Sequence, residues 1–281
     1  MTKLDRLVSF SSRTPRALVA ILAVALLPAC LSGGGDTSSP THGSPTGDDD
    51  GRGNGDGNNG GENTPGAAFV ASGSVVDTQG KPLPNVEIVV DNQLLADSNE
   101  TGKTDGNGRY RIELPSIAAT WHVSATHSVE YHGRTYSFPL HPNDDSAFAG
   151  NTGGVRNFEW KLSGKRPDNG FYGAFVVGYT EPGDFSFDVR EVELTLVPDG
   201  PLVDGSTGET VSGKFVSTGD GDAVQDIPLG RYTISAKIDG TPLGIRLRNS
   251  GAAYEDSLTS DFDAPYGSLS VYNLEVELKR P

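Results

Sequence analysis

Beyond residue 67, apolar and polar side chains alternate over short stretches that are separated by turn residues. Alternation with a period of two predicts β-strands that bury one face and expose the other. Because such apolar rows have polar backs, we expect two sheets packed face to face, and the predicted fold class is all-β. The clearest rows are Val86, Ile88 and Val90; Tyr110, Ile112 and Leu114; and Phe158, Trp160 and Leu162.

Turn residues and the cysteine count support this expectation. Asp-Gly-Asn-Gly at 105–108 precedes the strand predicted at Tyr110, and Gly and Asn tolerate the positive φ that a tight turn needs. The chain has 37 Gly and few runs of Leu or Ala, which disfavours helices. A single Cys allows no disulfide within the chain, so the hydrophobic core must stabilise the fold alone.

Three short strings recur in the same order along the chain. Three matches in order predict two copies of one β-domain, with loops of different length, joined near residues 163–170. We therefore expect two tandem antiparallel β-sandwiches, at 68–163 and 164–281. The strings are Val-Glu-Ile at 86–88 and Val-Glu-Leu at 192–194, Gly-Arg-Tyr at 108–110 and 230–232, and the alternating runs at 157–162 and 273–278.

The first of these domains resembles a known family at two places. Residues 73–88 read Gly-Ser-Val-Val-Asp-Thr-Gln-Gly-Lys-Pro-Leu-Pro-Asn-Val-Glu-Ile, and residues 104–110 read Thr-Asp-Gly-Asn-Gly-Arg-Tyr. Together they resemble the carboxypeptidase regulatory-like domain, although Asn85 stands where that family usually has Gly. The resemblance implies a transthyretin-like, Ig-like sandwich of about seven strands that is not itself catalytic. The domain also resembles the starch-binding-like superfamily and the B-type repeats of collagen adhesins.

The start of the chain has the pattern of a secretory signal. Within residues 1–29, four basic residues precede an apolar run at 17–27, and small residues lead up to Cys30. The apolar run is too short to span a membrane as a helix, but its length and flanks are typical of a signal peptide. One alternative is an ordinary signal peptide, whose removal would leave Cys30 as a free thiol.

Leu-Pro-Ala-Cys at 27–30 resembles the lipobox of bacterial lipoproteins, from which Pro28 is a departure. The resemblance implies cleavage before Cys30, lipidation of its thiol, and a membrane anchor built on that lipid. Leu31 follows the cysteine, which in Gram-negative lipoproteins implies the outer membrane rather than retention at the inner one. We therefore expect a lipid-anchored protein of the cell envelope.

Residues 30–67 join the lipidated Cys to the first sandwich and are rich in Gly, Asp and Ser, with no aromatic residue. Such a segment cannot bury enough apolar surface to fold, so we predict a disordered tether. Removal of residues 1–29 takes away four basic residues and one acid, which changes the formal charge from −15 to −18. A chain this acidic repels nucleic acid and anionic headgroups, so we expect no nucleic-acid partner.

Four of the five histidines lie close together in sequence, at His122, His127, His132 and His141. His127 and Glu130 match the His-x-x-Glu zinc motif of metallocarboxypeptidases. On a strand, however, these two side chains point to opposite faces, so we expect no enzyme and no cofactor. A metal site built from His122, His127 and His132 remains an alternative, and solvated imidazoles around a hairpin at 131–136 are the simpler interpretation.

Carbohydrate binding would need exposed aromatic rings beside hydrogen-bonding groups. Trp121 and Trp160 fall on apolar rows and are expected in the core. Clustered acids on loops, such as Asp261 and Asp263, are read as solvated charges, with calcium binding as the alternative. The exposed candidates for ligand binding lie on and beside the predicted hairpin and are Tyr131, His132, Arg134 and Tyr136.

Together these features predict a non-enzymatic, membrane-anchored lipoprotein that presents β-sandwich modules for adhesion, scaffolding or ligand binding. One alternative is a carbohydrate-binding module protein, and a second is a metal-binding protein that uses the His122–His141 cluster. The predicted partners are the membrane, through the lipid on Cys30, and a polysaccharide or another protein of the cell envelope.

Overall fold

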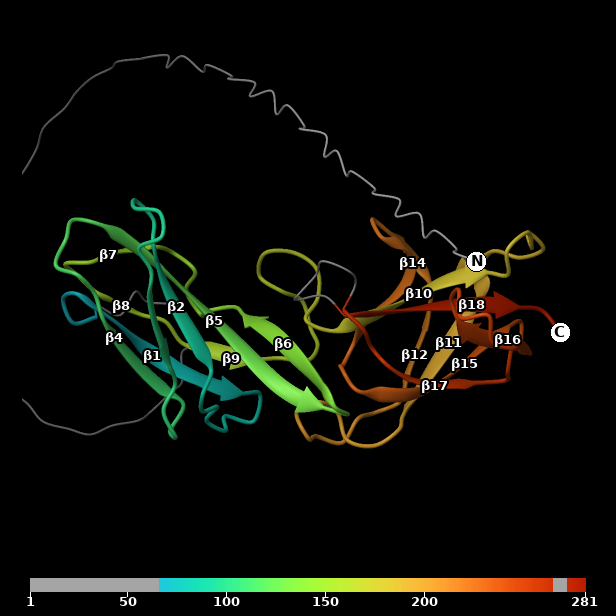
Figure 1. Cartoon of the computed structure of the whole chain (residues 1–281). Coiled ribbons are helices and arrows are strands. Elements are labelled where there is room, and N and C mark those ends of the chain that lie inside the picture. Colours follow the sequence, from blue (N-terminus) through green and yellow to red (C-terminus); the bar gives the residue numbers. More distant parts are fainter. Residues whose placement is uncertain (1–65, 265–271) are drawn as a thin grey trace, which may run out of the picture. The chain divides into compact units, whose positions relative to one another are not determined.

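The computed structural model describes residues 66–264 and 272–281 (Figure 1). The predicted signal peptide, Cys30 and nearly all of the predicted tether lie outside the described residues. The regular structure within the described part of the chain is strands and one short 3-10 helix, η1 (Val189–Glu191), so the predicted all-β class is confirmed. None of these residues belongs to a helix long and apolar enough to cross a membrane.

The first sandwich contains two sheets. In the four-stranded sheet, β1 pairs with β4 on one side and with β8 and β9 on the other; the five-stranded sheet has the order β3-β2-β5-β6, with β7 also on β5 (Figure 1). The strands are β1 (Val70–Asp77), β2 (Glu87–Asn92), β3 (Glu100–Lys103), β4 (Arg109–Glu113), β5 (Thr120–Tyr131), β6 (Arg134–Leu140), β7 (Phe148–Ala149), β8 (Gly154–Val155) and β9 (Phe158–Trp160).

Two pairings in this sandwich differ from the antiparallel expectation. β8 and β9 run parallel to β1, with Val75 opposite Phe158 and Asp77 opposite Trp160. Parallel neighbours need a long crossover connection, and here the rest of the sandwich supplies it. The first and last strands of the sandwich therefore run in the same direction side by side.

The three predicted apolar rows are all buried. Val86, Ile88 and Val90 are fully inaccessible to solvent, and the rows that contain Tyr110 and Phe158 are at most 9% exposed. Trp121 and Trp160 also lie in this core, as expected. The predicted turn at 105–108 is present: the Asp105 carboxylate accepts hydrogen bonds from the backbone N–H groups of Asn107 and Arg109, which lower the pKa of Asp105.

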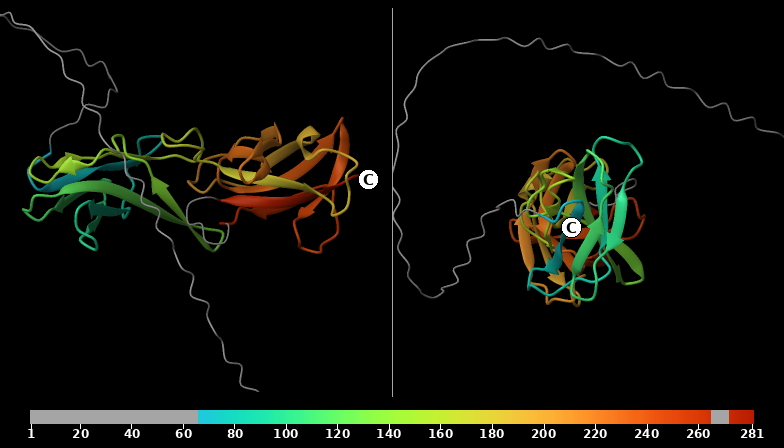
Figure 2. Two further views of the ribbon diagram at one scale, coloured as in Figure 1. Left: turned by 90° about the horizontal axis from the view of Figure 1, so that it is seen from above. Right: turned by 90° about the vertical axis from the view of Figure 1, so that its left-hand side faces the viewer.

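The second group of strands is hydrogen-bonded into one nine-stranded sheet. Figure 2 shows these strands, coloured yellow to red, from two further sides. The order of the sheet is β12-β11-β15-β16-β18-β10-β14-β13, with β17 also on β15. β16 pairs with β15 through residues 241–243 and with β18 through 244–247, so it carries the sheet from one layer to the other. The strands are β10 (Ala174–Thr180), β11 (Glu193–Pro198), β12 (Val211–Lys214), β13 (Val216–Thr218), β14 (Gly221–Ile227), β15 (Arg231–Ile238), β16 (Thr241–Leu247), β17 (Leu258–Asp261) and β18 (Asn273–Lys279).

The strand pairings of the two sandwiches correspond one to one over most strands. β10 pairs antiparallel with β14 and parallel with β18, as β1 does with β4 and β9. β11 pairs with β12 and β15, as β2 does with β3 and β5. Two of the repeated strings, at Val86 and Val192 and at Asn157 and Asn273, fall at the starts of corresponding strands.

The third repeated string is a false match. Gly108 precedes β4, whereas Gly230 precedes β15, and β15 corresponds to β5 rather than to β4. The register identifies the true counterpart, because Ile88 faces Ala125 as Leu194 faces Ala236. Tyr-Thr-Ile-Ser-Ala at 232–236 thus corresponds to Trp-His-Val-Ser-Ala at 121–125. A Gly-Arg-Tyr string therefore stands at the start of strands that hold different places in the fold.

Thr104 provides a direct test of how the first sandwich is held together. Its buried hydroxyl donates to the Leu83 carbonyl at 2.7 Å and accepts from the Val86 N–H at 2.9 Å. Thr104→Val leaves both backbone groups unpaired, and we expect the free energy of unfolding to fall by about 1–3 kcal/mol. Trp fluorescence during urea unfolding measures this, because Trp121 and Trp160 both belong to the first sandwich. Thr104→Ser is the control, and an equal loss in both variants would contradict the hydrogen-bond account.

Candidate functional site

The four residues expected to bind a ligand lie at one end of the β5–β6 hairpin. His132 and Gly133 form its turn with φ of 49° and 75°, the left-handed backbone that a two-residue hairpin turn requires. The side chains around this turn contact the second sandwich, while His132 and Arg134 also remain exposed to solvent, as expected. We call this contact the joint; it comprises Tyr131, His132, Arg134, Tyr136 and Ser137 of the first sandwich and Pro201, Arg231, Asp261, Phe262, Asp263 and Tyr272 of the second.

Tyr131 links the two sandwiches through its hydroxyl. The hydroxyl donates to the Pro201 carbonyl at 2.8 Å and accepts from the Arg231 N–H at 3.0 Å. Its ring stacks on His132 with a centroid distance of 4.0 Å. Burial raises the pKa of Tyr131, so the hydroxyl stays protonated and can donate. The hydroxyl of Tyr131 and its ring therefore both have partners within the chain.

Tyr136 is buried, with 3% of its surface exposed, so the expectation of an exposed ring is wrong for this residue. Its hydroxyl donates to the Phe262 carbonyl at 2.9 Å. Burial raises the pKa of Tyr136 to about 12, and the neighbouring Asp261 carboxylate adds to the effect. Tyr136, Phe138 and Leu140 are the buried residues of β6, and at Tyr136 the groups that cover this face belong to the second sandwich.

Tyr272 completes the aromatic part of the joint and was not singled out by sequence reasoning. Its hydroxyl donates to the Ser137 carbonyl at 3.0 Å and accepts from the Ser137 N–H at 2.6 Å. Its ring lies 5.1 Å from that of Tyr136 and 5.7 Å from that of Phe138, measured between centroids. Tyr272 lies just before β18, outside the alternating run that drew attention to that strand, so periodicity gave no signal.

Charged groups surround these tyrosines. His132 Nδ1 lies 2.8 Å from Asp261 Oδ1, and Arg231 Nη1 donates to Asp261 Oδ2 at 2.7 Å. Arg134 pairs with Asp263. Asp261 and Asp263 therefore face cationic and imidazole groups of the joint, which is the environment of structural ion pairs rather than of a calcium site.

The histidines proposed as metal ligands do not converge. His122 and His127 are five residues apart on β5, which places them about 17 Å apart along the strand and on opposite faces. His122 Nε2 lies 2.8 Å from Asp145, and the His127 ring packs on Trp160 at 4.5 Å, where burial lowers the pKa of His127. Glu130 is exposed and accepts from the Thr135 hydroxyl, on the face opposite His127.

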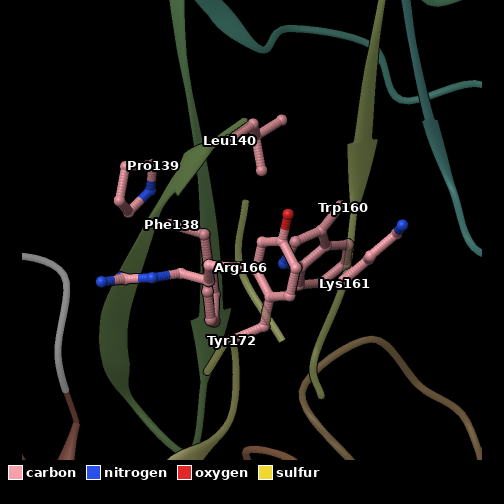
Figure 3. Close-up of a pocket in the computed structure, with 7 residues that line it drawn as sticks. All are labelled: Phe138, Pro139, Leu140, Trp160, Lys161, Arg166 and Tyr172. Carbon is pink, nitrogen blue, oxygen red and sulfur yellow. The ribbon is translucent and has the colours of Figure 1, made fainter. Parts of the chain in front are cut away.

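The segment that connects the sandwiches packs on both of them. The Gly164 N–H donates to the Asp226 carboxylate of the second sandwich at 2.8 Å. Tyr172 and Arg166 lie over Phe138 and Trp160 of the first sandwich, and Figure 3 shows these side chains around a small pocket. The pocket holds about 20 Å³ of space open to water. That is room for about one water molecule and too little for a sugar ring.

Comparison with known proteins assigns part of the first sandwich. Residues 71–148 match the carboxypeptidase regulatory-like domain. This match extends from β1 to the first residue of β7 and covers β2, β3, β5 and β6 of the five-stranded sheet. The resemblance inferred from residues 73–88 and 104–110 is therefore confirmed for this part of the chain. No curated protein matches the chain.

Several solved structures match the chain at low similarity. The Bacillus anthracis TIE protein is 16% identical, with a TM-score of 0.28, and the match covers 75% of this chain but only 34% of that one. The shaft pilin spaA from Lactobacillus rhamnosus GG is 14% identical over 76% of this chain and 100% of that one, with a TM-score of 0.23. A single B repeat unit of the collagen binding surface protein of Staphylococcus aureus is 11% identical, with a TM-score of 0.20, over 78% and 100%. Similarity this low carries no argument about function.

The buried hydroxyl of Tyr136 makes stability depend on pH in the alkaline range. Its pKa is about 12 in the folded chain and 10.0 without the protein environment, so the unfolded chain loses this proton first as the pH rises. The free energy of unfolding therefore falls between about pH 10 and 12. In Tyr136→Phe we expect a shallower fall across this window, measured by urea unfolding at several pH values. Tyr179→Phe, outside the joint, is the control, and equal slopes for Tyr136→Phe and the parent would refute this account.

Proposed function

We propose that this protein is a non-enzymatic lipoprotein of the bacterial outer membrane in which two joined β-sandwiches form a spacer for adhesion or scaffolding. The lipid on Cys30 anchors the chain, and the segment up to residue 67 acts as a flexible tether. The first sandwich follows the tether, and the second carries the surface that meets a polysaccharide or another protein of the cell envelope.

The joint is the observation that carries this proposal. A spacer must hold its modules in a fixed orientation, and hydrogen bonds from the tyrosine hydroxyls together with ion pairs are directional contacts that specify one arrangement. Each neutral hydrogen bond contributes about 0.5–1.5 kcal/mol, so several of them acting together resist rotation of one sandwich against the other. The packed connection at Gly164 and Tyr172 adds to this constraint.

The joint also bears on the alternative functions. A carbohydrate site on the hairpin would need the rings of Tyr131 and Tyr136 to be free, but one is stacked and hydrogen-bonded and the other is buried. A metal site would need imidazoles that converge. Among residues 66–264 and 272–281, no group of three His, Cys, Asp or Glu side chains is placed to hold a metal ion.

The anchor is tested in cells with Cys30→Ala. We expect the parent chain to incorporate labelled palmitate and to fractionate with the membrane, because the lipobox-like sequence directs lipidation of that thiol. Cys30→Ala should lose the label and appear in the soluble fraction. Ser32→Ala, two residues away, is the control and should behave as the parent. A parent chain without label would disprove the lipid anchor.

The spacer is tested by the distance between the sandwiches. Spin labels on Thr101→Cys and Val216→Cys, in a Cys30→Ala background, report one exposed site on each sandwich. We expect a narrow distance distribution in double electron–electron resonance, which broadens when Tyr131→Ala and Arg134→Ala remove joint contacts. Arg111→Ala removes only a surface ion pair on β4 and is the control. A broad distribution before any change to the joint would disprove a rigid spacer.

A further inference from the structure

Exposed aliphatic side chains gather at the end of the first sandwich that lies at the start of β5, away from the hairpin. Leu94 is 63% exposed, Leu95 53% and Ile117 39%. Leu94 and Ile117 border an apolar groove of about 410 Å³ whose other walls include Phe69, Ala119 and Ala149. We call these residues, with Leu95, the tip groove. Clustered exposed apolar side chains of this kind mark an interaction site.

The loops around the tip groove hold their leucines outward. The buried Asn92 side chain accepts hydrogen bonds from the N–H groups of Leu94 and Leu95, at 3.0 and 3.2 Å. The Phe69 N–H donates to the Gly150 carbonyl at 2.7 Å, and the Gly150 N–H donates to the Ala119 carbonyl at 3.0 Å. Three loops are thus bonded to one another, and the turn after β2 is fixed with its aliphatic side chains exposed.

The tip groove is also free of charge, in a chain whose formal charge is −15. The four segments that surround it, at 66–70, 93–96, 115–120 and 149–155, contain no Asp, Glu, Lys or Arg. Contact with an apolar medium therefore removes no charge from water, which would be costly. Asp97, which directly follows the segment 93–96, is exposed and carries the acidic charge next to the groove in the sequence. The tip groove is the part of the first sandwich's surface whose lack of charge suits contact with a lipid interface.

The described part of the chain begins beside this groove. The first described residue is Gly66, and Phe69 both lines the groove and hydrogen-bonds Gly150 on its rim. Cys30 lies 36 residues before Gly66, and a flexible chain of that length has a reach of about 30–36 Å. A short tether raises the effective concentration of the tip at the membrane to the millimolar range, where a few aliphatic contacts are enough for binding.

We propose that the tip groove docks on the lipid surface to which Cys30 is attached, with Leu94, Leu95 and Ile117 entering the headgroup boundary. This inference rests on the proposed lipid anchor. Docking at the tip directs the joint and the second sandwich away from the bilayer. The occupant is the uncharged, zwitterionic lipid interface, since the groove offers no basic residue to select an anionic headgroup.

The test imposes the anchor chemically, so that it does not depend on lipidation in cells. Residues 30–281 are coupled through Cys30, the only Cys, to maleimide lipids in phosphatidylcholine vesicles. In Leu95→Trp we expect a blue-shifted emission and at least twofold quenching by brominated lipid, beyond that of the parent with its buried Trp121 and Trp160. Phe185→Trp is the control: Phe185 is 93% exposed on the second sandwich, and a Trp there should stay unquenched.

Adding Ile117→Asp to Leu95→Trp should abolish the quenching, because a charge then enters the interface. Absence of quenching in Leu95→Trp on coupled vesicles would overturn lipid docking while leaving the anchor proposal to its own experiment. A blue shift that grows with protein concentration in the absence of vesicles would also overturn it, since the groove would then bind a second copy of the chain.

Discussion

Tyrosine hydroxyls that donate to backbone carbonyls are the contacts on which the pairing of the two sandwiches depends. Tyr131, Tyr136 and Tyr272 each bridge from one sandwich to a main-chain oxygen of the other. A carbonyl is fixed by its own strand or loop, so these bonds relate one backbone directly to another. The ion pairs of Asp261 lie around them and add charge complementarity.

Sequence patterns identified the class of fold and the interior of the first sandwich, because burial within one sheet follows a period of two. These patterns could not show whether solvent or a second domain covers an aromatic ring near the end of a strand. Tyr136 was for this reason expected to be exposed. The false match at Gly230 has a related cause, since buried strands draw on few residue types. Only the register, with Ala125 and Ala236 in equivalent places, distinguishes β5 from β4 as the counterpart of β15.

The two candidate surfaces of the first sandwich lie at opposite ends of β5. The end at Tyr131 is rich in charge and hydrogen bonds and is used within the chain, whereas the end at Thr120 is aliphatic and uncharged. Sequence reasoning drew attention to the first end because histidine and tyrosine side chains are common in binding and metal sites. The leucines of the other end gave no signal, since a loop's exposure is decided by local bonds such as those of Asn92.

The parallel pairing of β1 with β9, and of β10 with β18, has a mechanical consequence. In each sandwich the chain enters at the start of the first strand and leaves near the end of the last, and these two strands are direct neighbours. Tension applied along the chain slides them past each other lengthwise, so all the bonds of the ladder bear the load together instead of opening one at a time. Such an arrangement withstands pulling far better than a hairpin loaded at its open end.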